Sequence, residues 1–142
     1  MTDQKGNKLQ NITEKLIVAA VVIVAFSVRA HILFSTDLIP GTDPAYYLIQ
    51  TRSILETGSL AYGDTPLVFY IMAVVSWLVK AVFRLSTDSA VMVGVKLVAS
   101  LVPALAAVPA YLLVKSFQKG EGSVLSMLPV IAAAVAATLS SG

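Results

Sequence analysis

The chain has 142 residues, of which 57% are apolar and only 13% are charged, and its mean hydropathy is +0.84. This composition excludes an ordinary soluble domain and favours a protein that lies in a membrane among lipids. The net charge of +2 comes from basic residues scattered along the chain, so nucleic-acid binding is not predicted, and the absence of cysteine excludes disulfides and thiolate metal sites.

The N-terminal part of the chain combines a polar segment with a long apolar one. Residues 1–15 carry three lysines and little apolar surface, and we expect them to form a polar cytoplasmic tail. Residues 16–34 are almost entirely apolar and, as a helix rising about 1.5 Å per residue, nearly span a bilayer core of roughly 30 Å. A cleaved signal peptide is the other interpretation, but no small-x-small cleavage site follows closely and further apolar segments come later. We therefore expect an uncleaved first transmembrane helix.

Three further apolar segments predict additional membrane spans. They are residues 66–83, 97–114 and 123–139. The predicted fold class is therefore an all-α integral membrane domain over residues 16–142, with about four transmembrane helices. Pro66 stands at the tolerated first position of the second span, and Thr87-Asp88-Ser89 supplies capping residues ahead of the third. Pro103 and Pro109 lie inside the third span and predict a kink there.

The longest polar interval, residues 35–65, separates the first span from the second. It contains four acidic residues but a single basic one, Arg52, and we therefore place this loop outside the cytoplasm. That orientation puts the N-terminus in the cytoplasm of a multi-pass protein of the cell membrane. With alternating spans, Lys80, Arg84 and Lys96 fall on the cytoplasmic side, and Lys115 and Lys119 fall outside.

Residues 43–58 in this interval have the pattern of a short amphipathic helix that lies on the membrane surface. One face is expected to carry Tyr47, Leu48, Thr51, Ile54 and Leu55, and the opposite face Gln50, Ser53, Glu56 and Thr57. Asp43 falls at the N-cap, Pro44 at the first helical position, and Gly58 where a left-handed C-terminal glycine belongs.

Asp43 is the best candidate for chemistry in the chain, and two explanations of it stay open. An N-cap aspartate stabilises a helix by about 1 kcal/mol without any catalytic role. A carboxylate beside two tyrosines at the membrane surface can instead bind a divalent cation through its oxygens or accept a proton from a nucleophile. Arg52 and Glu56, four residues apart, can simply pair on the helix surface. Asp64, which precedes Thr65-Pro66, is interpreted more readily as a turn residue than as a ligand.

A first span is followed by G-T-D-P-A-Y-Y-L, then by the amphipathic R-S-I-L-E-T-G-S-L, and then by D-T-P-L-V-F-Y at the start of the second span. This order of parts resembles the N-terminal region of the GT-C superfamily of integral-membrane glycosyltransferases, which includes oligosaccharyltransferase catalytic subunits and protein mannosyltransferases. The resemblance implies a sugar donor attached to a polyprenyl or dolichyl phosphate and an acceptor on a protein, lipid or glycan. It also implies a longer enzyme with a second acidic motif beyond these residues, so we do not expect the 142 residues alone to turn over substrate.

The resemblance further implies roles for individual residues. Asp43 would be the essential acid near the donor, either as a ligand of a divalent cation such as Mg²⁺ or Mn²⁺ or as a general base. Tyr46, Tyr47 and Arg52 would be substrate-binding neighbours. The archaeal oligosaccharyltransferase pattern follows its acid with Tyr-His, whereas this chain has Tyr46-Tyr47-Leu48-Ile49, so only the superfamily is implied. The alternative is a small non-catalytic membrane subunit or a transporter fragment, in which Asp43 has no chemical role.

Overall fold

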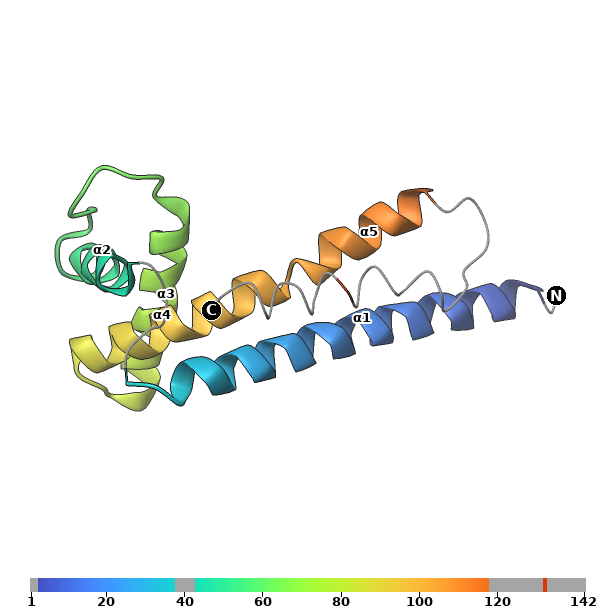
Figure 1. Cartoon of the computed structure of the whole chain (residues 1–142), viewed down its shortest axis with the longest axis horizontal. Helices are drawn as coiled ribbons and strands as arrows, with labels where there is room; N and C mark the ends of the chain where they lie inside the picture. The colour runs from blue at the N-terminus through green and yellow to red at the C-terminus, as the bar shows by residue number, and fades with distance from the viewer. Residues whose placement is uncertain (1–2, 38–42, 118–131, 133–142) are drawn as a thin grey trace. The chain divides into compact units, whose positions relative to one another are not determined.

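A computed structural model of the chain describes residues 3–37, 43–117 and 132 (Figure 1). In this described part the secondary structure is helical, which confirms the predicted all-α class. The five helices are α1 (Asp3–Phe34), α2 (Pro44–Thr57), α3 (Leu67–Phe83), α4 (Thr87–Ala104) and α5 (Ala107–Phe117). They divide into two compact units: the first contains the described residues of Met1–Arg29 and Val102–Ser141, and the second contains Ala30–Leu101.

Two stretches of the described chain are long and apolar enough to cross a membrane. They are Ile12–Phe34, with 23 residues, and Thr87–Leu113, with 27 residues. They overlap the predicted spans 16–34 and 97–114, whereas α3, predicted as the second span, is a shorter apolar helix of 17 residues. The predicted fourth span, residues 123–139, lies outside the described residues apart from Ala132. Length and composition therefore give two candidate membrane spans within residues 3–37 and 43–117.

α1 begins at Asp3, well before the apolar segment starts at Leu16. The segment predicted as a polar tail is therefore helical from Asp3 and continuous with the apolar part of α1. Extending an existing helix avoids the cost of nucleating a new one, and the Lys, Gln and Glu residues of this segment are good helix formers.

In the first unit, α1 packs against α5 and the end of α4. The buried side chains of this core are Val18, Ala25, Ala104 and Ala107. Three of these four are alanines, and small side chains let helices approach closely. The carboxylate of Glu14 accepts hydrogen bonds from the Tyr111 hydroxyl at 2.8 Å and from the Lys115 ammonium at 2.9 Å. Because Glu14 precedes the core in α1 and Lys115 follows it in α5, the two helices run in opposite directions.

The third predicted span is interrupted at Pro103. α4 ends at Ala104 and α5 starts at Ala107. The N–H of Ala106 donates to the carbonyl of Pro103 at 3.1 Å, which is a three-residue turn instead of a four-residue helical bond. Pro109 falls in the first turn of α5, where an N–H would have no intrahelical partner. The predicted kink is thus present as a break between two helices.

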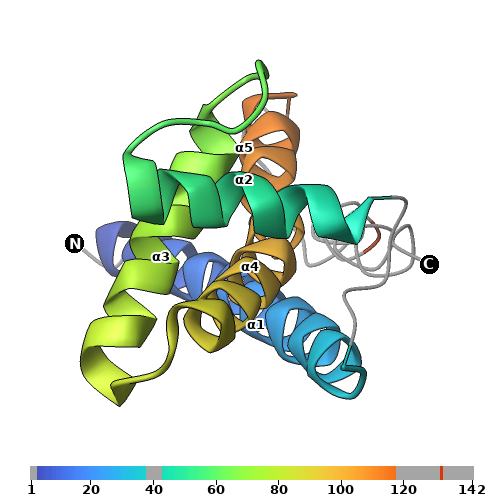
Figure 2. The same ribbon diagram turned by 90° about the vertical axis from the view of Figure 1, so that its left-hand side faces the viewer.

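In the second unit, α2 lies across α3, and α3 runs at a steep angle to the first turns of α4 (Figures 1 and 2). These helices and the end of α1 share one core, whose buried members are Leu33, Phe69, Met72, Val91, Val95 and Val98. Where α3 and α4 cross, Gly94 faces Ser76, and a Cβ placed on Gly94 would lie 2.7 Å from the Cα of Ser76. The close crossing therefore depends on the absence of a side chain at position 94.

The starts of α3 and α4 lie within one residue of their predicted positions. Pro66 occupies the N-cap of α3, and its carbonyl accepts a hydrogen bond from the N–H of Tyr70 at 3.1 Å. Ser86 precedes α4, and its hydroxyl accepts the N–H of Ser89 at 3.3 Å. The residue that caps α4 is therefore Ser86, which lies just before the predicted capping residues Thr87-Asp88-Ser89.

Candidate functional site

α2 begins and ends where the sequence predicts. Pro44 is its first residue, and Gly58 ends it in the left-handed region at φ 78°, with its N–H bonded to a helix carbonyl at 2.9 Å. Asp43 occupies the N-cap position with an exposed side chain, and that side chain makes no capping hydrogen bond to α2. The hydrogen bond from a helix N–H to the Asp43 side chain, which the capping explanation requires, is therefore not seen in the described part of the chain. Residues 38–42, which include the first two members of Gly-Thr-Asp-Pro, lie outside that part.

In the first turn of α2, Tyr46 links the helix to the loop that precedes α3. Its hydroxyl donates to a carboxylate oxygen of Asp64 at 2.7 Å, and its ring stacks on Tyr62 with the centroids 6.1 Å apart. The hydrogen bond to Asp64 raises the pKa of Tyr46, and the negative charge of Asp43 contributes to the same rise. The hydrogen bond from Tyr46 is also the main reason why the pKa of Asp64 is lowered, with the N–H and hydroxyl of Thr65 adding to the effect. Asp43 and Asp64 thus both act on the Tyr46 hydroxyl.

Gln50 is the residue that fixes this loop, and its predicted position on the polar face is wrong. The side chain is fully buried, with an exposed fraction of 0%. Its Nε2 donates to the Tyr46 hydroxyl and to the Tyr62 carbonyl, both at 3.0 Å. Its Oε1 accepts the N–H groups of Ala61 at 2.8 Å and of Tyr62 at 3.1 Å. Because the loop folds back over α2, Gln50 is covered by backbone that helical periodicity alone does not reveal.

The rest of the predicted apolar face of α2 agrees with the structure except at Tyr47. The members that are buried or pack against the core of the second unit are Leu48, Thr51, Ile54 and Leu55. Tyr47 is 39% exposed, although its ring centroid lies 5.7 Å from that of Phe69. Tyr47 also meets Tyr46 edge to face at 6.2 Å. A partly exposed phenol therefore stands next to Tyr46, on which the charge of Asp43 acts.

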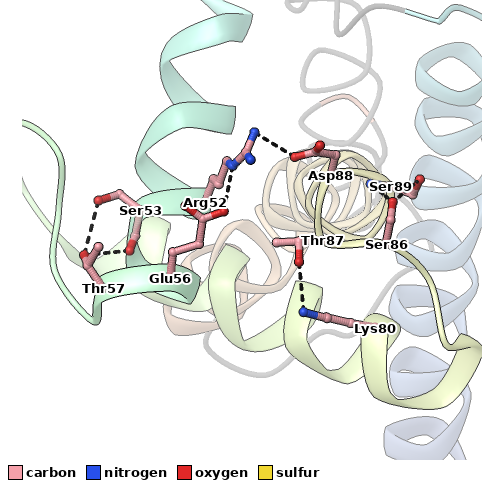
Figure 3. Close-up of polar contacts among 9 residues, drawn as sticks. All are labelled: Arg52, Ser53, Glu56, Thr57, Lys80, Ser86, Thr87, Asp88 and Ser89. Carbon is pink, nitrogen blue, oxygen red and sulfur yellow. Dashed lines mark hydrogen bonds and ion pairs between the residues drawn. The ribbon is translucent and has the colours of Figure 1, made fainter.

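Arg52 lies on the second half of α2 and pairs with two carboxylates (Figure 3). Its Nε contacts Glu56 at 2.8 Å, as the sequence spacing predicts, and its Nη1 contacts Asp88 of α4 at 2.8 Å. These two acidic neighbours raise the pKa of Arg52. At about 1.5 Å per residue, Arg52 stands roughly 14 Å along the helix from Asp43. The charge of Asp43 therefore acts on Tyr46, and Tyr46 contacts Tyr47, whereas Arg52 lies apart from Asp43.

Metal binding at Asp43 requires ligands beyond this one carboxylate. Among the described residues, no group of three or more His, Cys, Asp or Glu side chains lies together. Asp64 has both oxygens engaged, one by the Tyr46 hydroxyl and the other by the N–H of Thr65 at 2.6 Å, which agrees with its interpretation as a turn residue. A cation at Asp43 would therefore take its other oxygen ligands from residues outside this set or from a substrate phosphate.

Comparison of the chain with known protein families, with curated proteins and with solved structures finds no match.

Proposed function

We propose that this chain is the N-terminal part of an integral-membrane glycosyltransferase of the GT-C type, with Asp43 as its catalytic or metal-binding acid. The observation that carries the proposal is the exposure of the Asp43 side chain. Its carboxylate is exposed at the N-terminus of α2 and is not used for capping, so it is available to a substrate. The two candidate membrane spans support a location at a bilayer, where a lipid-linked donor would be found.

In the proposed reaction an acceptor hydroxyl or amide attacks the anomeric carbon of a sugar that is linked to a polyprenyl or dolichyl phosphate. The bond between the anomeric carbon and the phosphate oxygen breaks, and the lipid phosphate leaves with the bonding electrons. As general base, Asp43 accepts the proton that the acceptor loses. As a metal ligand, Asp43 would hold a divalent cation such as Mg²⁺ or Mn²⁺ that neutralises charge on the leaving phosphate.

The neighbours of Asp43 differ in how well they suit substrate contact. Tyr47 is partly exposed and can offer a ring face to a sugar or acceptor. The Tyr46 hydroxyl is held by Asp64 and Gln50, so we assign Tyr46 to shaping the site. Arg52 is paired with Glu56 and Asp88, and a donor phosphate would have to displace one of these carboxylates to reach it.

The proposal places the N-terminus in the cytoplasm and the segment from 35 to 65 on the outer side of the cell membrane, in contact with lipids and with the donor. Transfer is tested with membranes that contain the full-length protein and a panel of radiolabelled polyprenyl-phosphate and dolichyl-phosphate sugars. We expect label from at least one donor to appear on a protein, lipid or glycan acceptor. Absence of transfer from every donor, with the protein present and folded, would contradict the proposal.

A further inference from the structure

Residues on either side of α3 in the sequence meet directly in the second unit. Arg52 of α2 precedes α3, Asp88 of α4 follows it, and the two side chains lie 2.8 Å apart (Figure 3). A helix of 17 residues rising about 1.5 Å per residue is roughly 25 Å long, close to the thickness of a bilayer core. If α3 crossed the membrane, the polar segments that carry Arg52 and Asp88 would lie at opposite surfaces. The ion pair is incompatible with that crossing.

A second contact relates α4 to the end of α1 within the same unit. The ammonium of Lys96 donates to the backbone carbonyl of Thr36 and lies 5.6 Å from the ring centroid of Phe34, at the end of α1. The distance from Nζ to the Thr36 oxygen is 2.6 Å, and Lys96 is 5% exposed. If each predicted span crossed the membrane in turn, Lys96 would lie on the opposite side of the membrane from Thr36. The hydrogen bond between them instead requires both residues to lie at the same depth relative to the membrane. The first turns of α4 therefore lie on the same side as the polar interval 35–65.

α3 also presents an apolar stripe on the side that faces away from the core. Its members recur every three or four residues and are 42–74% exposed: Leu67, Ile71, Val74, Leu78 and Val82. Tyr70 and Trp77 follow one edge of this stripe and are also exposed. The buried residues Phe69, Met72 and Val79 occupy the opposite face. A continuous exposed apolar surface of this kind indicates a binding partner.

We propose that the partner is the bilayer itself, with α3 lying along the outer membrane surface and its apolar stripe, including Val74, in the boundary between headgroups and acyl chains. The described chain then crosses the membrane twice, through α1 and through Thr87–Leu113. Lipid is favoured over a protein partner because the described part of the chain carries two apolar stretches of membrane-spanning length. In addition, Tyr70 and Trp77 are of the types enriched at bilayer interfaces, and the exposed Arg84 at the end of α3 suits phosphate headgroups. The inference rests on the membrane location in the proposed function and is independent of sugar transfer.

Single cysteines introduced into this cysteine-free chain test the crossing directly. Ala61→Cys reports the segment before α3, Ser89→Cys the start of α4, and Ser116→Cys the end of α5, and all three positions are exposed. Intact cells are treated with a membrane-impermeant maleimide, with detergent-permeabilised cells as the control for reactivity. We expect the first two cysteines to label from one side and Ser116→Cys from the other.

Two other outcomes identify what has failed. If Ser89→Cys labels together with Ser116→Cys and opposite to Ala61→Cys, α3 crosses the bilayer and the inference is overturned while the membrane location stands. If the three variants stay in the soluble fraction, the membrane location in the proposed function fails, and the inference fails with it.

Trp77 is the only tryptophan and stands on the exposed edge of α3, so it reports the depth of this helix without any labelling. In a spanning α3, Trp77 would lie about 15 Å from the start of the helix, near the centre of a roughly 30 Å core. The full chain is reconstituted into phosphatidylcholine vesicles whose acyl chains carry bromine either near the headgroup or near the bilayer centre. We expect the greater loss of Trp77 fluorescence with the shallow bromine. Greater loss with the deep bromine would support a crossing, and no loss with either lipid would indicate that protein covers the stripe; both results overturn the proposal.

Discussion

Gln50 and Tyr62 are joined by two hydrogen bonds of opposite direction: Nε2 of Gln50 donates to the Tyr62 carbonyl at 3.0 Å, and Oε1 accepts the Tyr62 N–H at 3.1 Å. The side-chain amide of Gln50 thus bonds both the N–H and the carbonyl of Tyr62, as the backbone of a neighbouring β-strand would. Since Gln50 is fully buried and also bonds the Tyr46 hydroxyl, one side chain fixes both the loop and a tyrosine on which the charge of Asp43 acts. The geometry around the candidate acid therefore depends on a residue that takes no part in the proposed chemistry.

Replacing Gln50 should loosen this loop. In Gln50→Leu, the N–H groups of Ala61 and Tyr62 lose their acceptor, and an intramolecular hydrogen bond of this kind typically contributes about 0.5–1.5 kcal/mol to stability. We expect a lower melting temperature in detergent and faster proteolysis within residues 58–66. Ile49→Leu, at the exposed neighbouring position, is the control and should leave both unchanged. Equal melting and cleavage for the two variants would show that Gln50 does not hold the loop.

The bond between Tyr46 and Asp64 should be visible in pH titrations. The pKa of Tyr46 is raised by the Asp64 carboxylate, so the bond is fully formed below the ordinary tyrosine pKa of about 10 and is lost as pH rises through the raised value. The pKa of Asp64 is lowered, so its contribution is present above the ordinary aspartate pKa of about 3.9 and is lost as pH falls through the lowered value. The pair therefore stays intact across neutral pH.

Asp64→Asn removes the negative charge, and the pKa of Tyr46 should then fall toward its ordinary value. Tyrosinate absorbance at alkaline pH measures this shift, and Tyr46→Phe identifies the component that belongs to Tyr46 among the five tyrosines. An unchanged titration of that component in Asp64→Asn would show that the hydrogen bond is not formed.

Because α3 and α4 cross closely at Gly94, replacing this glycine should lower the stability of the protein. In Gly94→Ala the added methyl meets the Ser76 side chain and also its backbone N at 2.8 Å, so backbone must move. Overpacking of this kind typically costs about 1–3 kcal/mol. Gly63→Ala is the matched control, because a Cβ there meets nothing within 4 Å, and it should change stability by less than about 0.5 kcal/mol. Thermal unfolding in detergent compares the two, and similar melting temperatures would mean that the helices do not approach so closely.

The sequence predicts those features of the fold that are set by local chemistry. Pro44 and Gly58 give the ends of α2 because one has its φ preset and the other tolerates φ 78°. Gln50 and Asp88 are the residues whose roles could not be predicted, because their partners come from the loop and from another helix. Periodicity assigns a residue to a face of its own helix, but it does not tell which backbone covers that face.

In the candidate site, too, contacts between residues close in sequence could be predicted, and contacts between distant residues could not. The turn role of Asp64 and the pairing of Arg52 with Glu56 follow from short spacings in the sequence, and both are present. The bond from Tyr46 to Asp64 joins residues 18 positions apart and depends on the path of the loop between them. The chemical role of Asp43 rests on the resemblance to GT-C enzymes and on an exposed carboxylate that makes no capping hydrogen bond, and this role stays a prediction.

Glycosyl transfer by Asp43→Asn in the full-length protein decides whether the Asp43 carboxylate takes part in the reaction. Asparagine caps a helix about as well as aspartate, so this change removes the carboxylate and spares any capping role. We expect transfer from the lipid-phosphate donor to fall by about 10²- to 10⁴-fold, the usual contribution of a general base, at unchanged protein level. Asp37→Asn, in the same polar interval, should retain wild-type transfer. Full transfer by Asp43→Asn would show that Asp43 is neither the base nor a required metal ligand, and would favour a non-catalytic membrane protein.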